Sequence, residues 1–155
     1  MYLEDYFIPH ESNFLWPRKT VVATGVFDVL TYSHFELLKF AKTYGSYLLV
    51  GINSDRSVKQ LKGESRPIHN ETQRAKMLES IRWVDGVIIF NELNVVNFLQ
   101  KVKPNFWIKG NDYTLETLNQ EERAAAQTLG VDIRFFPYIK GLSSSKLIQE
   151  YNLQT

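Results

Sequence analysis

The residues of this chain that could do chemistry begin with the stretch from Gly25 to His34. An apolar run at residues 20–23 is typical of a buried strand, and Gly25 lies in the segment that ends it. His34 then opens a segment whose apolar residues recur at helical spacing. A strand that turns through glycine into a helix N-terminus can bind phosphate, because free N–H groups and the helix dipole point at the anion. The spacing therefore predicts a phosphate site between Gly25 and His34.

Three other polar segments, each at the end of a predicted strand, contain side chains that could bind phosphate. They are Lys62 to Ile68, Ile108 to Tyr113 and Gly141 to Ile148. Taken singly, each has a plainer interpretation: solvated charges in a loop, a turn built on Asn and Asp, and a serine-capped helix. The first stretch has plainer interpretations too, since Gly25 could serve only to reach a positive φ and Asp28 could cap the helix.

The elements that must position these residues alternate between strand and helix. Apolar runs predict strands at residues 20–23, 47–52, 86–90, 106–108 and 131–136. Helical spacing and capping residues predict helices at about 33–44, 71–81, 95–102, 114–129 and 143–151, and a short one between 53–55 and 61. Gly45 and Gly130 are expected just after two of them. This alternation indicates a parallel sheet with helices on both faces, whose ligands bind at the carboxyl ends of the strands.

Composition limits the class of protein. A chain of 155 residues with 44% hydrophobic and 23% charged residues predicts one globular domain. The net charge of +1 gives no argument for a nucleic-acid partner. The absence of cysteine excludes disulfides, a thiolate nucleophile and a zinc–thiolate site.

The ends of the chain give further expectations. No apolar stretch approaches the ~20 residues that a transmembrane helix needs, and the start lacks the basic residues of a signal peptide. We therefore expect a cytoplasmic protein without a membrane partner. Residues 1–18 form an aromatic extension, expected to pack on its own domain or on a partner subunit, and residues 19–155 form a single domain.

The string from Gly25 to His34 resembles the G-x-F-D-x-x-H-x-G-H signature of the cytidylyltransferase-like nucleotidyltransferases. Thr31 stands where that family has its first His, and Ser33 stands where it has Gly. The other segments resemble the heptose-1-phosphate adenylyltransferase branch, the nucleotidyl-transfer domain of ADP-heptose synthases. That branch has L-K-G-x-x-R-P, Q-R and V-K-G-x-D-Y, and the family has G-x-S-[ST]-[ST]-x-[IL]. Glycerol-phosphate and choline-phosphate cytidylyltransferases have an Arg where this chain has Tyr138.

The resemblance covers about residues 21–151 and implies a Rossmann-like, three-layer α/β domain with a five-stranded parallel sheet. It also implies site residues for catalysis, for the nucleotide and for the second substrate. The catalytic residues would be His34, Thr31 and Lys109. The nucleotide and its phosphates would be bound by Gly25, Val26, Phe27, Ser33, Lys109, Gly110, Asp112, Ser143, Ser144 and Ser145. The phosphorylated substrate would be bound by Asp28, Lys62, Arg66 and Arg74, although Arg74 could equally form a surface pair.

The implied reaction is attack by a sugar- or polyol-phosphate oxygen on the α-phosphorus of a nucleoside triphosphate, with release of pyrophosphate. The adenylyltransferase branch favours ATP over CTP, and family relatives imply a homodimer. No metal ligand from the protein is expected, since Mg²⁺ would be held by the substrate phosphates. Thr31 replaces a charge-assisted imidazole bond by a weaker one, a loss on the order of 10- to 100-fold in rate if nothing compensates.

Three hypotheses about function remain open. The favoured one is a working nucleotidyltransferase with an altered phosphate clamp. The second is a degenerate domain that binds a nucleotide or sugar nucleotide without turnover, as a sensor or assembly subunit. The third, a protein-interaction domain, is supported only by the aromatic extension.

Overall fold

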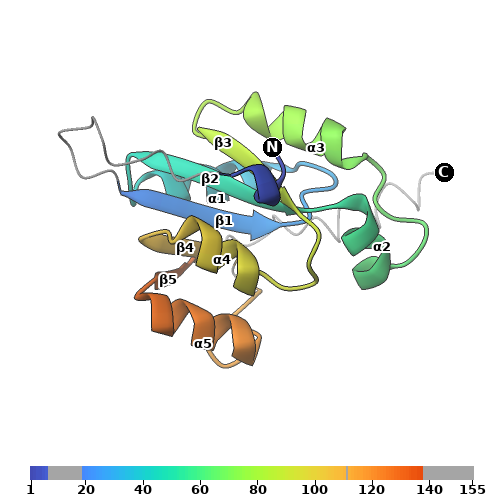
Figure 1. The fold of residues 1–155 in the computed structure, drawn as a ribbon. Helices are drawn as coiled ribbons and strands as arrows, with labels where there is room; N and C mark the ends of the chain where they lie inside the picture. Colours follow the sequence, from blue (N-terminus) through green and yellow to red (C-terminus); the bar gives the residue numbers. More distant parts are fainter. Residues whose placement is uncertain (7–18, 111, 138–155) are drawn as a thin grey trace.

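Five parallel strands form the central layer of the structure, a computed structural model that describes residues 1–6, 19–110 and 112–137 (Figure 1). Their spatial order is β3-β2-β1-β4-β5, so the chain starts in the middle of the sheet and fills first one side and then the other. The strands are β1 (Thr20–Gly25), β2 (Tyr47–Asn53), β3 (Gly86–Phe90), β4 (Phe106–Lys109) and β5 (Asp132–Phe135). The predicted Rossmann-like parallel sheet is therefore confirmed.

Helices cover both faces of this sheet because alternate strand residues point to opposite sides. In β1, Val21 and Ala23 pack with Leu38, whereas Val22 packs with Phe98 on the other face. Helices α1 and α3 thus lie on one face, and α4 and α5 on the other (Figure 1). The helices are α1 (Tyr32–Lys42), α2 (Asp55–Lys62), α3 (Glu71–Glu79), α4 (Val96–Val102) and α5 (Gln120–Leu129).

The N-terminal segment belongs to the same core. A short 3₁₀ turn, η1 (Leu3–Asp5), lies beside β3, and Tyr2 forms a parallel bridge with Ile89. Leu3 and Tyr6 are buried in the core cluster that also contains residues of α4. This part of the aromatic extension therefore packs on its own domain.

Two predicted features differ from the structure. The helix expected after Tyr113 begins at Gln120, because Thr114 and Thr117 bond each other's backbone N–H groups and form a turn. Gly45 does not end α1 in a left-handed conformation. It is needed for close approach, since a Cβ there would lie 2.5 Å from the carbonyl oxygen of Lys19.

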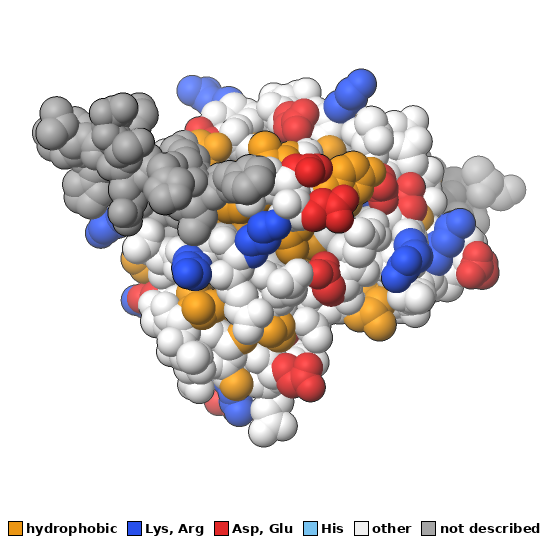
Figure 2. Space-filling view, in the orientation of Figure 1, with side chains coloured by type: hydrophobic (Ala, Val, Ile, Leu, Met, Phe, Trp, Pro, Cys, Tyr) orange, Lys and Arg blue, Asp and Glu red, His pale blue; other side chains and the backbone are white. Residues whose placement is uncertain are grey.

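Charges are mixed on the surface. Basic and acidic side chains are interspersed on the face shown in Figure 2, as the net charge of +1 leads one to expect. Among the helices of the described ranges, none combines the length and apolarity needed to cross a membrane. The final predicted helix, 143–151, lies outside the described residues.

Candidate functional site

The turn after β1 has an unusual backbone. Phe27 adopts the left-handed region with φ of 50°, which costs a residue with a Cβ about 1–2 kcal/mol. Gly25 does not have a positive φ, so the interpretation that it serves only to supply one is wrong. A Cβ on Gly25 would lie 3.1 Å from the Phe27 ring, so glycine leaves room for that ring. The ring in turn packs on His34, with ring centroids 5.3 Å apart.

The side chain of Arg74 bonds the backbone of this turn. Its side chain is fully buried, and Nη1 donates to the carbonyl oxygen of Val26 at 2.8 Å. In a trans peptide the next N–H points opposite to that carbonyl, so the N–H of Phe27 faces away from Arg74. No hydrogen bond among the described residues uses that N–H. Within the described ranges the turn therefore presents a backbone N–H without a partner, as a phosphate site requires.

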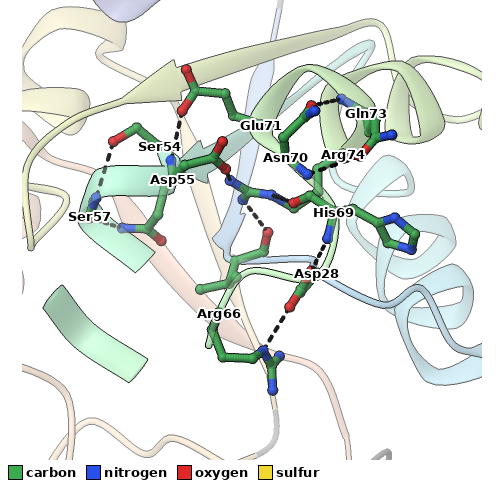
Figure 3. Close-up of polar contacts among 12 residues, drawn as sticks. Asp28, Ser54, Asp55, Ser57, Arg66, His69, Asn70, Glu71, Gln73 and Arg74 are labelled. Atoms are coloured by element: carbon green, nitrogen blue, oxygen red, sulfur yellow. Dashed lines mark hydrogen bonds and ion pairs between the residues drawn. The ribbon is translucent and has the colours of Figure 1, made fainter. Parts of the chain in front are cut away.

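The other contacts of Arg74 show that it is a structural residue of the site (Figure 3). Nε donates to the carbonyl oxygen of His69 at 3.0 Å, and Nη2 pairs with Oδ1 of Asp55 at 2.8 Å. The expected surface pair is wrong, because the guanidinium has no exposed surface. The same burial places Arg74 beneath the site, so the predicted direct contact with substrate is not supported.

Asp28 is also buried and bonds the loop after α2 (Figure 3). Its carboxylate accepts from Nε of Arg66 at 2.8 Å and from the backbone N–H groups of Ile68 and His69 at 2.9 and 3.0 Å. Burial alone would raise the pKa of Asp28, but these donors together lower it below the ordinary value. Asp28 does not cap α1, and its oxygens accept from the loop after α2. Its predicted contact with the substrate stays a prediction.

The N-terminus of α1 carries two of the three predicted catalytic side chains, Thr31 and His34. Thr31 is the N-cap residue, and its N–H donates to Nδ1 of His34 at 3.0 Å. The Thr31 hydroxyl lies 3.1 Å from the same nitrogen. Since Nδ1 accepts from the backbone, the neutral ring carries its proton on Nε2. Burial and the nearby charge of Lys62 lower the pKa of His34, which favours this neutral form.

Two predicted residues near this helix are free of protein partners in the described part of the chain. Ser33 lies in the first turn of α1, and Lys62 ends α2 on the exposed surface. Neither side chain makes a hydrogen bond or ion pair there. Their predicted contacts with phosphate stay predictions.

The end of β4 contributes Lys109. Its ammonium lies 4.1 Å from the centre of the Tyr113 ring and 5.5 Å from that of Trp107. Burial lowers the pKa of Lys109, while Glu122 and Asp112 partly oppose this shift. Lys109 makes no ion pair within the described residues. A half-buried cation that lies against aromatic faces and forms no ion pair in the described ranges is suited to receive an anionic ligand.

Gly110 and Asp112 follow Lys109. A Cβ on Gly110 would lie 2.7 Å from Oδ1 of Asp112 and 3.9 Å from Leu37 of α1. The end of β4 therefore lies against α1, one turn beyond His34. The structure thus brings the Gly25 turn, the start of α1 and Lys109 to one edge of the sheet, whereas Asn111 and Ser143, Ser144 and Ser145 lie outside the described residues.

Sequence reasoning missed several residues that shape the site. Asp55, predicted only as part of the segment 53–55 that begins the short helix, bonds Arg74. Tyr113 supports Lys109, and its place in the V-K-G-x-D-Y string was the one feature that could have indicated this role. Glu71 accepts from Asp55, a contact that no local pattern predicts.

Comparison with known proteins places this geometry in context. A family model described as cytidylyltransferase-like matches residues 22–150. Bifunctional protein HldE of Koribacter versatilis is 39% identical over 138 residues, which cover 87% of this chain and 28% of that protein. The protein of the same name from Campylobacter fetus subsp. fetus is 37% identical over 133 residues, 85% of this chain and 28% of that protein. The chain thus spans less than a third of the length of these relatives.

Solved structures agree on the fold. The lipopolysaccharide core biosynthesis protein from Thermoplasma volcanium superposes with a TM-score of 0.69 at 27% identity, covering 80% of this chain and 100% of that one. The pantoate-beta-alanine ligase of Francisella tularensis superposes with a TM-score of 0.56 at 16% identity, covering 88% of this chain and 70% of that one. At that identity the second similarity concerns the fold alone.

Proposed function

Because the chain belongs to the cytidylyltransferase-like family of nucleotidyltransferases, we propose that it transfers the nucleoside monophosphate of a triphosphate to a sugar or polyol phosphate. ATP is favoured over CTP by the motifs shared with the adenylyltransferase branch. A sugar phosphate is favoured by similarity to a protein of lipopolysaccharide core biosynthesis. The two HldE proteins, 39% and 37% identical to this chain, support the proposal of a nucleotidyltransferase that acts on a sugar phosphate.

One observation of the site supports the proposal most directly. His34, Lys62 and Lys109 come from three separate segments, and none forms an ion pair in the described part of the chain. Lys62 is close enough to His34 to lower its pKa, and the end of β4 lies against α1. Groups that carry positive charge or donate hydrogen bonds, and that form no ion pair within the described residues, suit a polyphosphate ligand.

The proposed chemistry needs positioning more than proton transfer. The attacking phosphate oxygen is already anionic, forms the new bond to the α-phosphorus in line with the departing pyrophosphate, and needs no general base. Nε2–H of His34, Nζ of Lys109 and the N–H of Phe27 would donate to oxygens whose charge grows during transfer.

Mg²⁺ would be bound through the phosphates of the substrate. Within the described residues, no three His, Asp or Glu side chains gather where they could hold a metal ion. The carboxylates of Asp28 and Asp55 are engaged by Arg66 and Arg74. When bound, the ion would neutralise phosphate charge, and the residues of the chain would align the two substrates.

Pyrophosphate release tests the proposal. ATP or CTP with Mg²⁺ should be assayed against a panel of sugar-1-phosphates and polyol phosphates, with Lys109→Met as the impaired variant. Lys39→Met is the matched control, because Lys39 is an exposed lysine of α1 without a hydrogen bond or ion pair in the described residues. Pyrophosphate release that requires an acceptor, and that falls in Lys109→Met but not in Lys39→Met, would support the proposed enzymatic activity.

Binding separates the enzyme from its alternative. ATP with Mg²⁺ should raise the melting temperature more than CTP does, since a ligand of the native state stabilises by RT ln(1 + [L]/Kd). A shift without pyrophosphate release from any acceptor would favour the degenerate binding domain. If no nucleotide or sugar nucleotide shifts the transition at millimolar concentration, both hypotheses are wrong.

A further inference from the structure

Hydrogen bonds connect the N-terminal segment to the N-terminus of α2. Oη of Tyr2 donates to Oε1 of Glu71 at 2.6 Å. The second oxygen of this carboxylate, Oε2, accepts from the backbone N–H of Asp55 at 2.6 Å. Glu71, at the start of α3, therefore joins two segments that are far apart in the sequence.

The same connection continues to the turn after β1 (Figure 3). Oδ1 of Asp55 accepts from Nη2 of Arg74 at 2.8 Å, and Nη1 of Arg74 donates to the carbonyl oxygen of Val26 at 2.8 Å. Arg74 is fully buried, so its guanidinium cannot exchange these partners for water without local opening. A displacement of Asp55 must therefore act on the Val26 carbonyl.

Glu71 is not needed to cap α3. Asn70 accepts from the N–H of Gln73 at 2.9 Å, and Gln73 accepts from the N–H of Asn70 at 3.1 Å, which completes a capping box. The carboxylate of Glu71 points instead to Asp55, as Figure 3 shows. Its two contacts therefore call for another role.

Tyr2 is held well enough to fix this carboxylate. The N–H of Ile89 donates to the carbonyl oxygen of Met1 at 2.8 Å, and Leu3 is buried in the core. The hydrogen bond to Glu71 and the charge of Glu71 raise the pKa of Tyr2. The hydroxyl thus stays a donor throughout the neutral range.

We propose that Glu71 is a positioning residue for the phosphate-binding turn and that Tyr2 holds its carboxylate in place. The N-terminal segment thereby sets the orientation of the Val26–Phe27 peptide, whose N–H faces the ligand. The predicted effect on turnover rests on the proposed function. The predicted effect on the turn and the adjoining loop does not.

The test uses Tyr2→Phe and Glu71→Gln in the full chain. Each variant removes one element of the connection and keeps the size of the side chain. Tyr44→Phe and Glu79→Gln are matched controls, because neither the Tyr44 hydroxyl nor the Glu79 carboxylate makes a hydrogen bond in the described residues. The combined double variant shows whether the two residues act through one connection.

The first measurement is amide hydrogen exchange at Ile68 and His69. Their N–H groups bond Asp28, and the His69 carbonyl bonds Arg74, so they report on the same framework. We expect exchange to accelerate about 2- to 30-fold in both variants, the range of coupling along packed networks. The double variant should resemble the single ones, and the controls should resemble the wild type.

The second measurement is steady-state kinetics with the best acceptor and ATP. Both variants should lower kcat/KM by about 2- to 30-fold, with melting temperatures that match those of the controls. Unchanged amide exchange at Ile68 and His69 would overturn the proposal. A decrease in kcat/KM no larger than that of Glu79→Gln would overturn it too. Faster exchange in a protein that releases no pyrophosphate would refute the proposed function and leave this inference standing.

Discussion

Replacing Arg74 with methionine should lower the free energy of unfolding by about 2–6 kcal/mol. The buried guanidinium donates to the carbonyl oxygens of Val26 and His69, and methionine fills a similar space without donating. Each carbonyl left without its partner costs about 1–3 kcal/mol. The Asp55 carboxylate is 34% exposed and can bond water when Arg74 is replaced. The loss of this ion pair therefore adds little to the change in the free energy of unfolding.

Thermal and urea unfolding would measure this loss. For a chain of 155 residues, 1 kcal/mol corresponds to about 2–4 °C, so the melting temperature should fall by about 4–24 °C. Arg82→Met is the matched control, since Arg82 is exposed and makes no hydrogen bond or ion pair in the described residues. It should stay within about 0.5 kcal/mol of the wild type.

Arg74→Lys distinguishes charge from geometry. A lysine keeps the charge but cannot reach both carbonyls and Asp55 with a planar fork, so we expect an intermediate loss. A loss below about 1 kcal/mol in Arg74→Met, at an unchanged urea m-value, would refute the reasoning. The contacts of Arg74 would then not stabilise the turn.

Three further predictions concern the proposed catalytic residues. His34→Ala should lower kcat by well over tenfold with little change in KM, and Thr31→His should raise kcat, because both side chains act on charge that builds during transfer. Unchanged kinetics in His34→Ala would remove His34 from the phosphate clamp. Burial and the charge of Lys62 lower the pKa of His34, so the unfolded chain binds its proton first as the pH falls below about 6.5. Stability should therefore decrease as the pH falls through this window, and urea titrations of His34→Gln should show a weaker decrease. Burial lowers the pKa of Lys109, so affinity for Mg²⁺–ATP should fall as the pH rises through that lowered value, whereas Lys109→Arg should keep its affinity in calorimetric titrations.

The strands could be predicted from the sequence because each is a short apolar run. β2 and β3 are buried along almost their whole length, and such runs need no partner to be recognised. Their parallel arrangement followed from the helices between them. The bounds of the helices were less predictable, because side-chain hydrogen bonds to the backbone compete with helix formation. The turn formed by Thr114 and Thr117 before α5 is an example.

The polar framework of the site could not be predicted from local patterns. Arg74 and Val26 are 48 positions apart, and Asp28 bonds a backbone N–H of Ile68 that is 40 positions away. A charged residue in an amphipathic helix is normally assigned to the surface. Arg74 is buried only because the fold brings carbonyl groups and a carboxylate to it, which is a property of tertiary packing.

The bridge between Tyr2 and Ile89 also affects how the protein behaves before it reaches its native state. β3 is an edge strand of five residues, Gly-Val-Ile-Ile-Phe, a composition prone to pair with other chains and aggregate. Docking of residues 1–6 takes up the N–H of Ile89, whereas β5, the opposite edge, carries the exposed charges of Asp132 and Arg134. The N-terminal segment thus covers part of one edge, and the hydrated charged side chains of Asp132 and Arg134 protect the other, because pairing with another chain would remove their water. Refolding yield should therefore depend on the first six residues even under conditions where the finished fold is stable.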